Sequence, residues 1–72
     1  MYRFNREKIF ALFLSRQITT NELARRARIS HRAAARALAG LPVTAPVVAR
    51  VAQALNVDAL LFLLPLNSEG SE

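Results

Sequence analysis

Cysteine and tryptophan are absent from this sequence of 72 residues, and glycine occurs only twice. The lack of cysteine excludes disulfide bonds and thiolate metal sites, and it fits a reducing compartment. The scarcity of glycine argues against a glycine-rich phosphate-binding loop. A single core of this size is only marginally stable unless it is stapled or paired with a second chain. We therefore expect one small domain, with oligomerisation as the remaining common means of support.

Acidic residues are also scarce. Ten Lys and Arg residues, nine of them arginine, stand against five Asp and Glu, which gives a formal net charge of +5. All ten basic residues lie in the segment 1–50, whereas the segment 51–72 has three acidic residues and no basic one. Arginine gathered on one part of a small domain is the charge pattern expected of a protein that binds phosphate backbones. An ordinary solubilising surface is the alternative.

Long hydrophobic runs are lacking as well. The run ALLFLLPL is far shorter than the roughly twenty residues that a membrane helix needs, and IFALFL is too short for a signal-peptide core with its cleavage site. The sequence shows no nucleophile with a nearby base and no paired acids. The single histidine, His31, has no neighbouring metal ligands. We expect a cytoplasmic protein with no membrane association, no enzymatic activity and no cofactor.

Helix-capping signals predict where the first two helices begin, and the sequence gives no sign of a strand. Asn5 is a good N-cap for a helix that runs to about Arg16, and Phe4 and Ile9 form a hydrophobic staple across this start. The sequence TTNE, which begins at Thr19, is a capping box for the second helix.

Three further helices follow from the same kind of signal. Ser30 caps a third helix, which Gly40 can end by adopting a left-handed conformation. Thr44 caps a fourth, with Pro46 in its first turn, and Asp58 caps a short fifth. These boundaries predict a compact all-α domain of five helices over residues 1–66. The polar end NSEGSE, residues 67–72, is expected to be a disordered tail.

The spacing between the second and third helices is typical of a helix-turn-helix. This motif needs a small residue where the two helices cross, which Ala24 supplies, and an apolar residue just after the turn, which Ile29 supplies. The buried positions predicted for the motif are Leu23, Ala24, Ala27, Ile29, Ala34, Ala37 and Leu38.

From Ile9 to about Phe62 the chain resembles the lambda-repressor-like, Cro-type (Xre) family of DNA-binding domains. ITTNELARRARIS resembles the second helix and turn of this family, and VVARVAQALNVD resembles its fourth helix. The resemblance implies a five-helix domain, usually dimeric, that binds an operator with its third helix in the major groove. Arg28 stands where this family most often has glycine. If that residue has a positive φ, the cost is on the order of 1 kcal/mol.

The third helix has an inner and an outer face at 100° per residue. Ala34, Ala37 and Leu38 turn inward. The opposite stripe consists of Arg32, Ala35, Arg36 and Ala39. The guanidinium fork of arginine matches guanine O6 and N7, and alanine suits a thymine methyl. The residues predicted to read bases are His31, Arg32, Ala35 and Arg36. Phosphate contact or solvation is the alternative for each arginine.

Phosphate contacts are expected from the start of the second helix, where free backbone N–H groups favour an anion. The residues predicted to contact phosphates are Thr20, Asn21, Arg25, Arg28 and Ser30. An N-terminal arm carrying Arg3, Arg6 and Lys8 could extend this contact.

Both ends of the chain carry more large apolar side chains than one small core can hide. The predicted dimer or partner surface consists of Phe10, Phe13, Leu14, Leu61, Phe62, Leu64 and Leu66. Packing of the two ends against each other is the alternative.

These patterns favour a sequence-specific regulator of transcription that binds double-stranded DNA. The expected form is a dimeric, nucleoid-associated repressor of bacterial or phage type that recognises a palindromic operator. The alternative is a small module that engages a larger repressor or another protein through its apolar ends, with little DNA binding.

Overall fold

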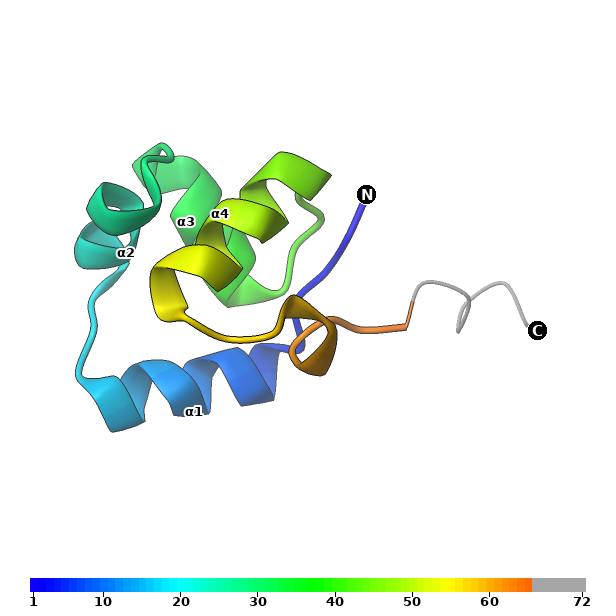
Figure 1. Cartoon of the computed structure of the whole chain (residues 1–72), viewed down its shortest axis with the longest axis horizontal. Coiled ribbons are helices and arrows are strands. Elements are labelled where there is room, and N and C mark those ends of the chain that lie inside the picture. The colour runs from blue at the N-terminus through cyan, green and yellow to red at the C-terminus, as the bar shows by residue number, and fades with distance from the viewer. Residues whose placement is uncertain (66–72) are drawn as a thin grey trace.

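The computed structural model describes residues 1–65, which form four α-helices and one short 3-10 helix. These are α1 (Arg6–Arg16), α2 (Thr20–Ala27), α3 (His31–Ala39), α4 (Ala45–Leu55) and η1 (Ala59–Leu61), shown in Figure 1. Within residues 1–65 there is no β-strand, only two isolated bridges, so the predicted all-α class is confirmed. The predicted short fifth helix is present only as a 3-10 helix, so a domain of five α-helices is not confirmed. Asp58 does cap it, by accepting from the Leu60 N–H at 3.0 Å, but it ends after three residues as η1.

Short side chains determine where the first three helices begin. The Asn5 side chain accepts from two N–H groups of the first turn of α1, at 3.1 and 3.2 Å. Thr19 and Ser30 each accept one such bond, from the third residue of the helix that follows. The carboxylate of Glu22 instead accepts from the guanidinium of Arg26 at 2.9 Å, so only the threonine half of the predicted capping box is formed among the described residues.

All four α-helices end on a residue in the left-handed conformation, and only one of these residues is glycine. The C-cap φ values are 55° at Gln17, 59° at Arg28, 77° at Gly40 and 57° at Asn56. Gly40 was predicted to adopt this conformation. Its close surroundings also favour glycine, because a Cβ there would lie 3.3 Å from the Cβ of Arg6 and 3.4 Å from the Phe4 oxygen.

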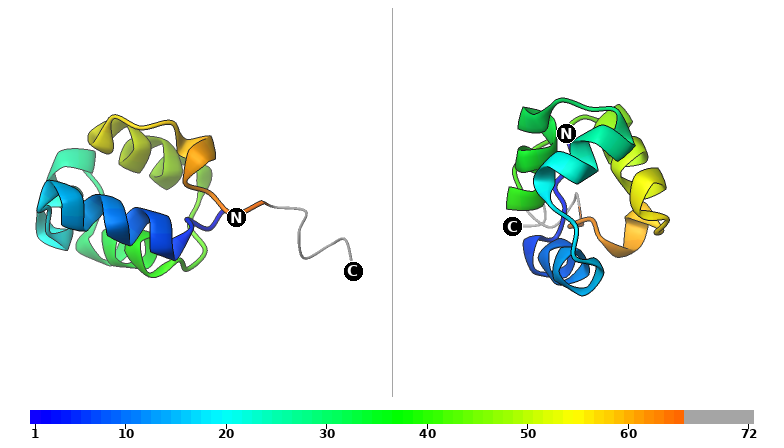
Figure 2. Two further views of the ribbon diagram at one scale, coloured as in Figure 1. Left: turned by 90° about the horizontal axis from the view of Figure 1, so that it is seen from below. Right: turned by 90° about the vertical axis from the view of Figure 1, so that its left-hand side faces the viewer.

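The core lies where α2, α3 and α4 meet above α1 (Figure 2). Its largest fully buried side chains are Phe4, Ile9, Leu23, Val51 and Leu55. Ala34 and Ala37 are both 0% exposed, which lets α3 pack closely against its neighbours. Of the seven positions predicted to be buried, Leu23, Ala27, Ala34 and Ala37 are buried, and Ala24, Ile29 and Leu38 are half-buried against the core.

The N-terminal segment, residues 2–5, lies within the body of the domain and is not the predicted arm. Tyr2 and Val43 exchange two backbone hydrogen bonds of 2.8 Å. The Leu64 N–H donates to the Arg3 carbonyl at 2.8 Å, and the Asn5 N–H donates to the Phe62 carbonyl at 2.6 Å. The segment is therefore held between the α3–α4 connection and the end of the described chain.

Candidate nucleic-acid interface

The connection between α2 and α3 is a tight turn held from both sides. The backbone N–H groups of Arg28 and Ile29 both donate to the Ala24 carbonyl, which closes the end of α2. Arg50 of α4 donates from Nη1 to the Arg28 carbonyl at 3.1 Å. The sequence analysis missed this role of Arg50, although Arg50 is the only charged residue of α4. The angle between α2 and α3 is thus supported by α4 as well as by the turn itself.

The positive φ of Arg28 leads to a prediction about stability. A residue with a Cβ costs about 1 kcal/mol more than glycine in this conformation. We expect Arg28→Gly to have a free energy of unfolding about 1 kcal/mol higher than Arg28→Ala, as measured by urea denaturation. Both variants lack the arginine side chain, so the comparison isolates the backbone. Equal stability of the two variants would show that the positive φ at position 28 does not strain a residue with a Cβ.

The outer face of α3 is exposed to solvent. His31, Arg32, Ala35 and Ala39 are all exposed, and they lie opposite the buried Ala34 and Ala37. The guanidinium of Arg32 has no hydrogen-bond or ion-pair partner among the described residues. Arg32 is therefore available to a ligand.

Arg36, which is also predicted to read bases, has a hydrogen-bond partner within the chain. It is half-buried, and its Nε and Nη2 both donate to the Pro42 carbonyl, at 3.2 and 2.9 Å. Because two of its donors hold the α3–α4 connection, the geometry favours a positioning role for Arg36 over base reading. Arg36 still lies near Arg32, because both arginines line one hollow together with Thr44 and Val47 at the start of α4. Sequence reasoning treated Thr44 only as a helix cap. Among the described residues its side chain makes no capping bond.

The residues predicted to bind phosphates are not all brought together. Thr20 lies beside Ala35 and Ala39 in a groove between α1 and α3, and Asn21 follows it in the first turn of α2. Ser30 is at the other end of α3, where its hydroxyl caps the helix. Thr20 and Ser30 therefore lie next to opposite ends of α3.

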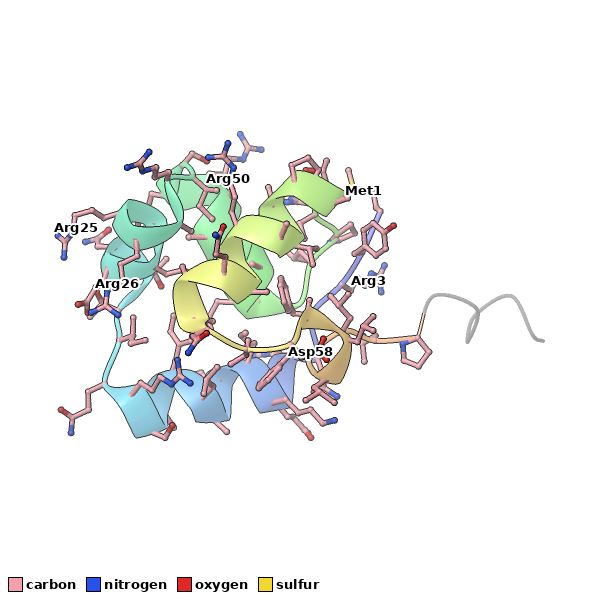
Figure 3. All side chains as sticks on the ribbon, viewed as in Figure 1. Met1, Arg3, Arg25, Arg26, Arg50 and Asp58 are labelled. Atoms are coloured by element: carbon pink, nitrogen blue, oxygen red, sulfur yellow. The ribbon has the colours of Figure 1, made fainter. Side chains whose placement is uncertain are left out.

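The other two residues predicted to contact phosphates, Arg25 and Arg28, lie elsewhere. Arg28 lines a hollow between α2 and α4 with Arg26, Arg50 and Gln53, and Figure 2 shows α3 and α4 on opposite sides of α2. Arg25 extends from the end of the molecule that α2 forms, as Figure 3 shows. The structure therefore places Arg28 at the hollow between α2 and α4, and not in the groove that Thr20 lines.

The predicted apolar surface is only partly exposed. Phe13 is 4% exposed and belongs to the core, because Ile9 and Phe13 share the inner stripe of α1. Phe62 is half-buried against the same core. The exposed members are Phe10, Leu14, Leu61 and Leu64, to which the structure adds Leu60. Leu66 and the predicted tail lie outside the described residues.

Residues 1–65 contain no group of His, Cys, Asp and Glu side chains that could hold a metal ion. None of the described helices is both long and apolar enough to cross a membrane. Comparisons with protein-family models, with curated proteins and with solved structures find no match to this chain. Inferences about its function therefore depend on the geometry and charge described above.

Proposed function

We propose that this protein is a sequence-specific, double-stranded DNA-binding regulator of transcription, in which α2 and α3 act as a helix-turn-helix of the lambda-repressor-like kind. The observation that carries the proposal is the outer face of α3, where an unpartnered Arg32 stands among small exposed residues. Alanine at the outer positions lets the backbone of α3 approach the floor of a major groove, which is wide enough to admit a helix.

Each part of this face has a distinct task in the proposal. Arg32 donates two hydrogen bonds to guanine O6 and N7, and His31 contacts the adjoining base edge from the first turn of α3. Thr20 and Asn21 contact a phosphate at the start of α2, where unpaired N–H groups and the helix dipole favour an anion. Arg36 holds the α3–α4 connection through Pro42 and so fixes the hollow beside Arg32.

The functional unit in this proposal is a dimer that represses by occupying promoter DNA. Leu14, Leu60 and Leu61 are each more than half exposed, and burying them against a second copy would remove apolar surface from water. A two-fold pair of α3 helices, one helical turn of DNA apart, would read a palindrome.

Selection of bound sequences from a random duplex pool tests the proposal. We expect enrichment of a palindrome with half-sites about 10 base pairs apart, bound by two chains, with an affinity that falls steeply with salt. The mass of the complex is measured by light scattering. Binding to the selected duplex that is no stronger than binding to random duplex would refute sequence-specific readout.

A protein-binding module is the second candidate, and the exposed leucines are the observation that favours it. Such a module would use Leu14, Leu60 and Leu61 to engage a larger partner. It would not require an unpartnered arginine on α3. The same selection separates the two functions, because the module would show no preference among duplexes.

A further inference from the structure

We propose that the groove between α1 and α3 is a second contact with the DNA backbone, in which Arg6 binds a phosphate and Phe10 packs against the adjoining deoxyribose. This inference rests on the proposed DNA-binding function and adds α1 to the interface. From the sequence, Phe10 was predicted to lie in a dimer or partner surface, and Arg6 to extend the phosphate contact as part of an N-terminal arm.

The groove is lined by residues from three helices: Arg6, Phe10, Thr20, Ala35, Leu38 and Ala39. Its volume is about 240 Å³. Pockets for small molecules usually measure about 300–1,000 Å³. The size therefore fits a shallow contact with part of a polymer better than an enclosed small ligand.

The chemistry of the lining matches a sugar–phosphate unit. Arg6 is exposed, and its guanidinium has no hydrogen-bond or ion-pair partner among the described residues. None of the six lining residues is acidic, so a phosphate would meet no opposing charge there. Phe10 is 52% exposed, and with the two alanines it forms an apolar wall that suits the face of a deoxyribose. A cation beside an apolar wall is complementary to a phosphate joined to a sugar.

The groove continues the outer face of α3. Ala35 and Ala39 lie on the same stripe as Arg32, three and seven residues further along the helix. Seven residues of α-helix span about 10.5 Å, so the two ends of this stripe can contact different parts of the DNA. With Arg32 at the base edges, the far end of the stripe reaches the strand that borders the groove. Arg6 lies near that end, because a Cβ on Gly40 would be 3.3 Å from the Cβ of Arg6.

Phe10 and Leu14 therefore have different roles although both are exposed on α1. Leu14 is one turn further along the helix and is not among the residues that line the groove. Leu14 remains in the proposed dimer surface, and Phe10 moves to the DNA interface.

The test uses the full chain with the substitutions Arg6→Gln and Phe10→Ala. Arg16→Gln and Leu41→Ala are the controls, because both residues are exposed and neither lines the groove or belongs to the proposed dimer surface. Affinity for a selected duplex and for a random duplex is measured by fluorescence anisotropy over a range of salt concentrations. We expect Arg6→Gln to weaken binding to both duplexes by roughly two- to fivefold for each bound chain, and to reduce the slope of log K against log salt by about 0.9 for each bound chain. Phe10→Ala should lower the affinity for both duplexes to a similar extent and leave the slope of log K against log salt unchanged.

The possible outcomes separate the groove from the proposed function. If Arg6→Gln and Phe10→Ala bind like their controls while the unaltered protein still prefers its selected duplex, the groove is not a DNA contact and the proposed function stands. If Phe10→Ala lost the dimer while the dimer that remained bound DNA with unchanged affinity, Phe10 would belong to the dimer surface, and the proposed contact between the groove and DNA would be wrong. If the unaltered protein bound DNA without any sequence preference, the proposed function would be wrong. The salt dependence of Arg6→Gln would still show whether Arg6 contacts a phosphate of the DNA backbone. If the unaltered protein binds no duplex, both proposals fail.

Discussion

Phe4→Ala is expected to lower the free energy of unfolding by about 3–5 kcal/mol, the range for truncating a buried phenylalanine. Phe4 is 1% exposed and is among the largest fully buried side chains. It also lies in the middle of the N-terminal segment, whose backbone bonds join Tyr2 to Val43 and Arg3 to Leu64. At about 0.05–0.15 kcal/mol per residue, a chain of this length has only about 4–11 kcal/mol in total. The substitution therefore removes a large part of the stability.

Urea denaturation followed by circular dichroism measures this loss. Phe10→Ala is the control, because it makes the same chemical change at a position that is 52% exposed. We expect it to cost less than about 1 kcal/mol. Equal losses in the two variants would mean that the N-terminal segment is not part of the folded core.

Arg32→Ala is expected to raise the Kd by about 5- to 150-fold for each half-site of the selected duplex, which corresponds to about 1–3 kcal/mol for each bidentate base contact. The preference for guanine at the contacted position should be lost as well, because the alanine has no donors for O6 and N7. Competition with duplexes altered at single positions measures that preference. If the variant discriminates among these duplexes as the unaltered protein does, Arg32 does not read bases.

Arg36→Ala provides the matched control, since Arg36 lies one turn further along α3 and donates to the Pro42 carbonyl. We expect this variant to lose stability, because the α3–α4 connection is no longer held by its side chain. Its preference among duplexes should stay as in the unaltered protein. The opposite pattern, with specificity lost and stability kept, would restore the base-reading role that the sequence predicted for Arg36.

The helix starts could be predicted because their signals are local. Asn5, Thr19 and Ser30 each bond to a backbone N–H two or three residues away, so the spacing alone contains the information. The same holds for the two faces of α3, because Ala34 and Ala37 recur with helical spacing on the buried face and leave Arg32 on the outer face. The face that carries Arg32 was identified in this way.

Other features could not be predicted because they depend on distant parts of the chain. The role of Arg36 depends on the orientation of the Pro42 carbonyl after a left-handed turn at Gly40. On α1 the residues at positions 9, 10, 12, 13 and 14 are all apolar, so no helical period shows that Phe13 is buried and Phe10 is not. The pairing of the N-terminal segment joins residues that are about 40 to 60 positions apart, and no local pattern encodes it.

That pairing has a consequence for the order of folding. Helical hydrogen bonds close small loops, whereas the bond between Arg3 and Leu64 closes a loop that spans most of the chain, at a greater cost in entropy. The helices and the α2–α3 turn can therefore form early, with the chain-spanning pairing added last. Interactions that form after the transition state mainly determine the rate of unfolding. The lifetime of the folded protein thus depends on a short extended segment, although nearly all its regular structure is helical.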